Sequence, residues 1–158
     1  HMFENSDDKH GLIAFDELVR DTLALVEPRA LHEGVMLHSS LNSGLKIHGD
    51  PTQLQQVILN LLNNSLDALA AKIMDGKSID VRTENAHERL LLHVTDNGVG
   101  IPDNLQPSVF ELFKTNKAQG MGVGLWLSRT VINAHRGDMR FQSSAGEGTH
   151  FEVALPVH

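Results

Sequence analysis

Apolar residues recur with helical spacing in three stretches of the chain. The first stretch runs from Phe15 to Glu33, and Pro28 is expected to kink or interrupt that helix. The second begins at Asp50-Pro51, an N-cap acid followed by proline, and continues to about Met74. The third spans Gly124 to Ala134 and ends at a glycine-containing turn. The pattern therefore predicts three helices.

Short runs bounded by turn residues predict strands between and after these helices. The expected strands cover residues 35–41, 45–48, 79–84, 90–95, 139–143 and 149–155. The last four form two hairpins, 79–84 with 90–95 and 139–143 with 149–155. Because helices are mixed with antiparallel strands and do not alternate with single strands, an α+β sandwich is favoured over a βαβ repeat.

Composition narrows the class of protein. The 158 residues are enough for one domain, and the net charge of −7 argues against non-specific binding to nucleic acid. The sequence has no cysteine, and no apolar run approaches the roughly 20 residues that span a bilayer. We interpret residues 1–2 as a cloning remnant, 3–11 as a linker from an upstream segment, and 12–158 as the domain.

The second helix combines an apolar face with an unusual set of amides. Asn60, Asn64 and Asp67 follow one another at helical spacing opposite the apolar stripe. Asparagine is a poor helix former, and amide oxygens suit a hard cation such as Mg²⁺. The alternative is a solvated helix face, and the helix alone does not decide between them. The apolar stripe is predicted to contain Leu54, Ile58, Leu61, Leu62, Leu66, Leu69 and Ile73.

Two glycine-rich segments suggest a site for a phosphorylated ligand. A strand leads directly into Asp96, followed by Gly98 and Gly100, so a carboxylate there could accept a hydrogen bond from an amino group such as that of adenine; an ordinary turn is the alternative. Residues 120–124 hold three glycines just before a helix, where backbone N–H groups can face a phosphate. This segment fits neither a P-loop nor a dinucleotide-binding fingerprint.

Residues between the glycine segments allow simple interpretations. Phe110 and Phe113 are expected to anchor the intervening loop to the core. Lys114 and Lys117 could reach phosphate oxygens as mobile point charges.

Taken in order, these motifs resemble the nucleotide-binding fold shared by histidine kinases, type II topoisomerases, heat-shock chaperones and mismatch-repair ATPases. The similarity is closest to sensor histidine kinases with a short lid, although Asn116 stands where that type usually has threonine. The resemblance implies a two-layer α+β sandwich of the Bergerat fold, with a mixed, largely antiparallel sheet covered on one face by about three helices. The matching motifs are residues 53–69, 96–100, 110–113, 120–125 and 148–151.

The resemblance also implies roles for individual residues, with ATP and Mg²⁺ as the bound species. Asn64 would ligate Mg²⁺ with Asn60 beside it, Asp96 would bind the adenine amino group with support from Thr149, and Lys117 would approach the γ-phosphate. Asn60, Asn64 and Lys117 would be catalytic, and residues 112–121 would form a mobile lid. The remaining nucleotide-binding residues would be Asp67, Gly98, Gly100, Ile101, Lys114, Thr115, Gly120, Met121, Gly122, Val123, Gly124 and Leu125.

Asn60 separates two branches of this fold. Topoisomerase-type and chaperone-type ATPases carry a glutamate general base at that position, one helical turn before the metal-binding asparagine. An amide cannot take a proton from water at neutral pH. The sequence therefore favours phosphoryl transfer to a protein acceptor over hydrolysis.

The expected acceptor is not in this sequence. None of the ten histidines lies in a segment resembling His-Glu-Leu/Ile-Arg-x-Pro-Leu. We therefore expect a separate dimerisation and phosphoacceptor hairpin, a response regulator as the partner of the full-length protein, and a cytoplasmic, monomeric fragment that binds neither nucleic acid nor membrane. The parent protein could be membrane-anchored. A clamp ATPase, an anti-sigma-type serine kinase and a non-catalytic nucleotide-binding regulatory module remain as alternatives.

Overall fold

The computed structural model describes residues 11–110 and 122–157. Its elements, in chain order, are β1 (Leu12–Ala14), α2 (Phe15–His32), β2 (Met36–Leu41), β3 (Lys46–His48), α3 (Pro51–Ala70), β4 (Ser78–Ala86), β5 (Arg89–Asp96), a short 3₁₀ turn (Gln106–Ser108), α4 (Gly122–Ala134), β6 (Asp138–Ser144) and β7 (Gly148–Pro156). None of the helices in these two ranges is long and apolar enough to cross a membrane.

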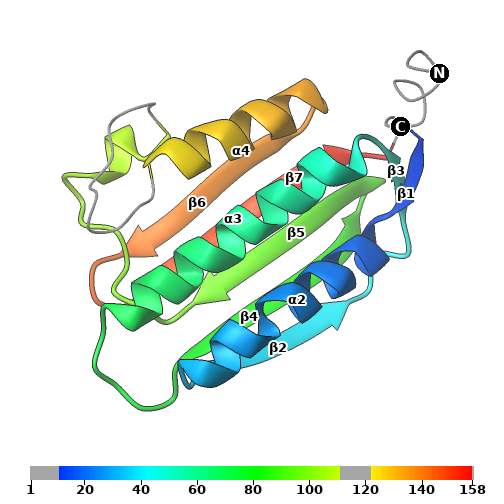
Figure 1. The fold of residues 1–158 in the computed structure, drawn as a ribbon. Coiled ribbons are helices and arrows are strands. Elements are labelled where there is room, and N and C mark those ends of the chain that lie inside the picture. Colours follow the sequence, from blue (N-terminus) through cyan, green and yellow to red (C-terminus); the bar gives the residue numbers. More distant parts are fainter. Residues whose placement is uncertain (1–10, 111–121, 158) are drawn as a thin grey trace.

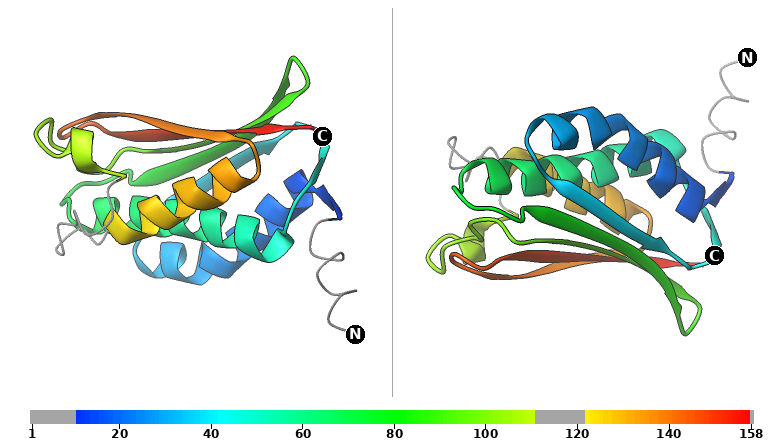
Figure 2. Two further views of the ribbon diagram at one scale, coloured as in Figure 1. Left: turned by 90° about the horizontal axis from the view of Figure 1, so that it is seen from above. Right: turned by 90° about the horizontal axis from the view of Figure 1, so that it is seen from below.

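Two layers make up the described part of the chain. A five-stranded sheet has the order β2-β4-β5-β7-β6, in which β2 and β4 are parallel and the other neighbours antiparallel. Helices α2, α3 and α4 lie side by side on one face of this sheet (Figures 1 and 2). The predicted α+β sandwich with a mixed, largely antiparallel sheet is confirmed.

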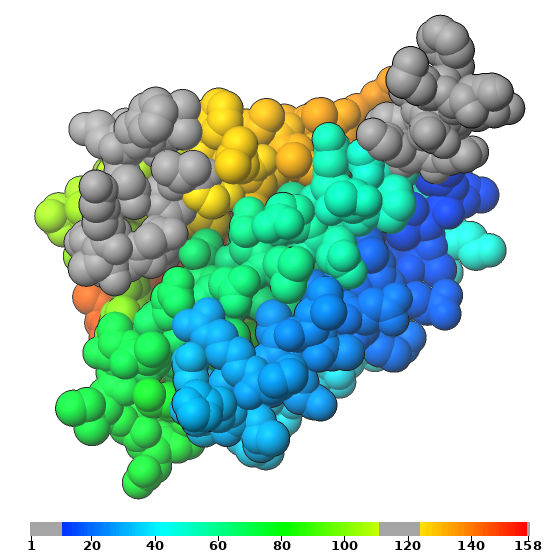
Figure 3. Space-filling view, viewed as in Figure 1, coloured from blue at the N-terminus to red at the C-terminus, as the bar shows by residue number. Residues whose placement is uncertain are grey.

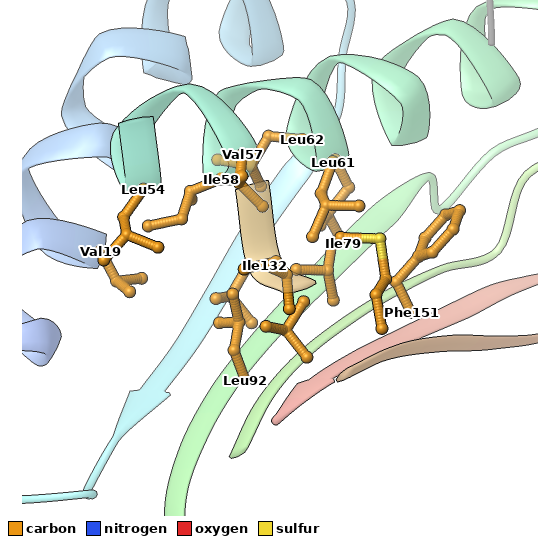
Figure 4. Close-up of a cluster of buried hydrophobic side chains, with 14 of the residues drawn as sticks. Val19, Leu54, Val57, Ile58, Leu61, Leu62, Ile79, Leu92, Ile132 and Phe151 are labelled. Atoms are coloured by element: carbon orange, nitrogen blue, oxygen red, sulfur yellow. The ribbon is translucent and has the colours of Figure 1, made fainter. Parts of the chain in front are cut away.

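The core lies between α3 and the central strands (Figure 4). On β5, Leu90, Leu92 and Val94 alternate toward the helices and are fully buried, as the period of two in a strand requires. The buried stripe of α3 sits above them and contains Leu54, Val57, Ile58, Leu61, Leu62, Leu66 and Leu69. Burying these side chains supplies the main driving force for the fold, at roughly 1.5–3 kcal/mol for each large apolar side chain.

The ends of α3 are set by local chemistry. The Asp50 carboxylate accepts the N–H groups of Thr52 and Gln53 at 3.0 and 3.3 Å, which is the predicted N-cap. The helix ends at Ala70, before the predicted Met74, and Ile73 is fully exposed. Ile73 therefore does not belong to the buried stripe, because Leu69 is the last helix residue that contacts the core.

The N-terminal end differs from the sequence analysis in two respects, since the helix is not interrupted at Pro28 and an additional strand is present. Helix α2 continues through Pro28 to His32, since Val26 and Ala30 remain buried on either side of the proline. Strand β1 was not predicted, because only three residues form it. It pairs antiparallel with β3, and the Gly49 N–H extends the pairing to the Gly11 carbonyl at 3.2 Å.

A hydrogen-bonded chain of side chains lies on the sheet face that the helices leave open. Glu84 Oε2 lies 2.6 Å from His93 Nε2, and His93 Nδ1 lies 2.9 Å from His150 Nε2. Burial and the neighbouring His93 lower the pKa of His150, Arg82 lowers it further, and Glu152 opposes them. The chain thus links β4, β5 and β7 on the reverse side of the core.

We predict that His150 makes stability depend on pH. Because its pKa is lower in the folded than in the unfolded chain, its contribution is present above about pH 6.5 and is lost as the pH falls. The free energy of unfolding of the wild type should fall between about pH 7.5 and 5.5. This fall should be smaller in His150→Gln, by less than about 1 kcal/mol because the ring is partly exposed. Urea unfolding measures this, with His38→Gln, which removes an exposed imidazole on β2, as the control. An identical pH dependence in His150→Gln and wild type would contradict the prediction.

Candidate nucleotide site

A pocket opens between α3 and the end of the central hairpin. Strand β5 ends at Asp96, the following turn passes beneath α3, and β7 begins beside it. The pocket wall is therefore built from segments that are far apart in the sequence. Its lining residues are Asn64, Asp67, Ala68, Ala71, Asp96, Val99, Gly100, Ile101, Thr149 and Phe151.

Asp96 is the buried charge of this pocket. Its side chain is 5% exposed, and Oδ1 accepts the Gly98 N–H at 2.9 Å. Burial raises the pKa of Asp96, while the N–H groups of Gly98 and Thr149, the Ser65 hydroxyl and the positive charge of Lys72 act in the opposite direction. The Ser65 hydroxyl is close enough to affect this carboxylate but forms no hydrogen bond of good geometry. Asp96 is thus a buried acceptor that could receive a donor from a ligand.

Three glycines permit the close backbone approaches that shape the pocket. A Cβ on Gly98 would lie 2.8 Å from the carbonyl carbon of Ala68 on α3. Gly148, at φ +110°, lies so close to the Asp96 carbonyl that a Cβ would overlap it, and Gly100, at φ +73°, approaches Ser144 in the same way. Side chains at these positions would push α3, the turn and β7 apart.

Further hydrogen bonds fix the loop after Asp96. The Ile101 N–H donates to Ser143 Oγ at 2.7 Å, and Ser143 Oγ also lies 2.8 Å from Thr149 Oγ1. Lys72 Nζ donates to the carbonyls of Gly146 and Asn97 at 2.7 and 3.4 Å. The turn between β6 and β7 is thereby tied to both the Asp96 loop and the end of α3.

The asparagines of α3 are not a solvated face. Asn64 is 7% exposed, lines the pocket, and has an amide nitrogen that is buried without a hydrogen-bond partner among residues 11–110 and 122–157. Asn60 Nδ2 donates to Ser128 Oγ on α4 at 3.1 Å and lies 3.5 Å from the Gly124 carbonyl. One amide therefore faces the pocket and the other connects α3 to α4.

The structure brings together most of the predicted residues that it describes. Asn64, Asp67, Asp96, Gly100, Ile101 and Thr149 line the pocket, and Gly98 lies against the pocket residue Ala68 without lining the pocket itself. Helix α4 begins at Gly122, two residues before the predicted start at Gly124, so Gly122, Val123 and Gly124 form its first turn instead of preceding it.

Two predicted binding residues that the structure describes have side chains outside the pocket lining. Asn60 bonds to Ser128 on α4. Leu125 is fully buried in the hydrophobic core, because the first turn of α4 packs against α3 and the sheet. Phe110 contacts Phe141 at 5.6 Å between ring centroids, in agreement with its predicted anchoring role. Five predicted site residues, together with Phe113 and the whole of the predicted lid, lie outside the described residues: Lys114, Thr115, Lys117, Gly120 and Met121.

Sequence reasoning missed four residues that shape the site. Lys72 was assigned to the interior of a longer helix, and Ser143 was taken only as the end of a strand. Phe151 was noted only for its motif, and Ser65 was not singled out. The register offers a signal for Ser143, because the predicted hairpin places it directly opposite Thr149.

We predict that Gly148→Ala disrupts the pocket more than Gly146→Ala. Both glycines have positive φ in the same turn, but a Cβ at position 146 meets nothing within 4 Å. Gly146→Ala should lose about 1 kcal/mol of unfolding free energy from backbone strain alone. Gly148→Ala should lose at least about 2 kcal/mol more, because its Cβ displaces the Asp96 backbone. Chemical denaturation compares the two. Equal losses would mean that the close approach to Asp96 is not required.

Comparisons with known proteins agree with this geometry. Residues 49–158 match the family model described as "Histidine kinase-, DNA gyrase B-, and HSP90-like ATPase". The signal transduction histidine-protein kinase AtoS of Escherichia coli (strain K12) is 38% identical over 148 residues, which are 92% of this chain and 24% of AtoS. The chain thus spans about a quarter of that relative's length.

Solved structures show the same fold. The catalytic domain of histidine kinase ThkA superposes with a TM-score of 0.82 at 25% identity, covering 94% of this chain and 95% of that domain. ThkA in complex with response regulator protein TrrA superposes with a TM-score of 0.78 at 22% identity, covering 94% and 42% of the two chains. The family model matches residues 49–158, a range that contains all the pocket-lining residues. We therefore conclude that this chain belongs to the histidine kinase-, DNA gyrase B- and HSP90-like ATPase family.

Proposed function

We propose that this chain is the catalytic ATP-binding domain of a two-component sensor histidine kinase. It would bind ATP with Mg²⁺ in the pocket below α3 and transfer the γ-phosphoryl group to a histidine on a separate helical hairpin. The observation that carries the proposal is that the domain has both a buried carboxylate in the pocket, Asp96, and an amide, Asn60, where a hydrolytic relative would have a general base. The match to AtoS, itself named a histidine-protein kinase, supports this branch of the family.

Adenine recognition is assigned to Asp96. Its Oδ1 is already bonded to the Gly98 N–H, so Oδ2 is the atom left to accept the adenine amino group. A charge-assisted hydrogen bond in a buried site is stronger than one between neutral groups. Thr149 would support this contact from β7, where it lies opposite Asp96 in the strand register.

The residues around Asn64 fit a Mg²⁺ ion. The Asn64 amide nitrogen is buried without a hydrogen-bond partner among the described residues, and this donor could bond to a phosphate oxygen or a metal-bound water, which would leave the amide oxygen for Mg²⁺. Mg²⁺ prefers oxygen ligands and keeps several waters, so one amide oxygen with the phosphates of ATP would suffice. When bound, the metal would offset negative charge on the triphosphate. Asn64 would orient it, and Asp96 would hold the opposite end of the nucleotide.

Asn60 favours transfer to a protein acceptor. Its amide donates to Ser128 Oγ and accepts from Gln56 Nε2 at 3.2 Å, so both ends of the group are engaged. An amide in this position cannot activate water. Catalysis would therefore depend on positioning the acceptor next to the phosphoryl group, which is how phosphoryl transfer is mainly promoted.

The remaining components belong to the parent protein. We propose an upstream dimerisation and phosphoacceptor hairpin, a response regulator that receives the phosphoryl group, and a cytoplasmic location for this domain. The domain alone would be monomeric. Lys117 and the residues at 112–121 are proposed to cover the triphosphate.

We predict that Asp96→Ala weakens binding of ADP with Mg²⁺. Removing a buried charged acceptor should cost roughly 1.5–3 kcal/mol, or about tenfold to a hundredfold in affinity. Isothermal titration calorimetry measures the change. Asp103→Ala removes a carboxylate from the neighbouring loop and serves as the control, because Asp103 does not line the pocket. Unchanged affinity in Asp96→Ala would mean that the nucleotide site is assigned wrongly.

We also predict that the domain alone neither hydrolyses ATP at a measurable rate nor labels itself. With the purified acceptor hairpin added, radiolabelled γ-phosphate should appear on the hairpin in an acid-labile form, because proximity supplies most of the rate. Rapid phosphate release by the domain alone would support a clamp ATPase. Label that survives acid but not base would indicate a serine kinase, and binding without any transfer would indicate a regulatory module.

A further inference from the structure

One cation links α2 to the pocket helix. The Arg29 guanidinium on α2 donates through Nη2 to Asp67 Oδ1 at 2.7 Å and through Nη1 to Asn63 Oδ1 at 3.1 Å, both on α3. Its Nε donates at 2.8 Å to Oε2 of Glu33, the C-cap residue directly after α2. Glu33 therefore holds the guanidinium from behind while the two Nη atoms face α3. The surfaces of α2 and α3 adjoin in the space-filling view (Figure 3).

Asp67 is also part of the pocket wall. It follows Asn64 by three residues, so the two side chains share one face of α3, and both line the pocket with Asp96. The wall thus carries two carboxylates where an anionic ligand is proposed to bind. The Asp67 side chain is 42% exposed, so its charge is only partly screened from a ligand in the pocket.

An unpaired carboxylate at this position would repel a phosphate chain. At an effective dielectric constant of about 20, two unit charges a few ångströms apart interact by a few kcal/mol, and solvent reduces this at a half-exposed group. The Arg29 guanidinium brings an opposite charge to within hydrogen-bond distance of Asp67. With Glu33 behind it the cluster keeps one net negative charge, but Asp67, the carboxylate that lines the pocket, has the guanidinium in direct contact, whereas without Arg29 its charge would be uncompensated.

We propose that Arg29 is a positioning residue of the nucleotide site, which sets the affinity for phosphorylated ligands by neutralising and orienting Asp67. This inference rests on the proposed function, because it takes a nucleotide as the ligand. Arg29 does not line the pocket and acts through Asp67. Its effect should therefore scale with the charge of the ligand and disappear when Asp67 is made neutral.

The experiment compares wild type, Arg29→Met, Asp67→Asn and the double variant by calorimetry. Adenosine, AMP, ADP and ATP are titrated in the presence of EDTA, so that a metal attracted by a free carboxylate cannot mask the repulsion. Arg29→Met should bind adenosine within about twofold of wild type, ADP about threefold more weakly and ATP up to about tenfold more weakly. The double variant should return ATP affinity to within about twofold of wild type. The losses should shrink at about 0.5 M salt.

Arg20→Met is the matched control, since it removes the same charge from an exposed position on α2 and should change none of these affinities. Equal weakening of adenosine and ATP in Arg29→Met, or no recovery in the double variant, would overturn the inference and leave Arg29 a structural link between helices. A wild-type domain that binds none of the four ligands, and still binds no ATP when EDTA is replaced by Mg²⁺, would instead contradict the proposed function. Thermal unfolding of each variant confirms that the compared proteins are folded.

Discussion

The site depends on burying the Asp96 carboxylate at the point where β5 passes under α3. A charge in that position is unfavourable unless several groups stabilise it. The Gly98 N–H supplies one hydrogen bond, and Lys72 supplies an opposite charge that also holds the adjacent turn. These groups can reach Asp96 only because glycines at 98 and 148 let α3 and β7 approach the backbone. The close backbone approaches at Gly98 and Gly148 and the stabilisation of the buried Asp96 carboxylate therefore depend on each other.

The elements that carry a local signal could be predicted from the sequence. The apolar stripe of α3, its Asp50-Pro51 start and the two hairpins all result from interactions between residues close in the chain. The same holds for Asp96 and its glycines, whose turn chemistry can be recognised without knowing the fold. Asn64 and Asp96 belong to different elements, and their convergence on one pocket followed only from resemblance to a known family.

Other features depend on long-range contacts and have no local signature. The parallel pairing of β2 with β4 joins residues about forty positions apart, and the three residues of β1 become a strand only because β3 lies beside them. Lys72 was predicted to lie within the second helix, but α3 ends at Ala70, two residues before it. Its contact with the Asp96 loop could therefore not be inferred. Arg29 and Asp67 are 38 residues apart, and neither position alone indicates the other.

Helix α3 is held from both sides, and this explains how its polar residues avoid the usual penalty. Toward α4, Asn60 bonds to Ser128, and toward α2, Asn63 and Asp67 bond to Arg29. Amides that would otherwise compete with the helix backbone are thereby engaged in tertiary contacts. Asn64, between these two connections, lines the pocket and has an amide nitrogen without a partner among the described residues. Because its neighbours on either side are fixed to separate helices, the helix backbone that carries Asn64 is held in place before any ligand binds, and a preorganised site loses less entropy on binding.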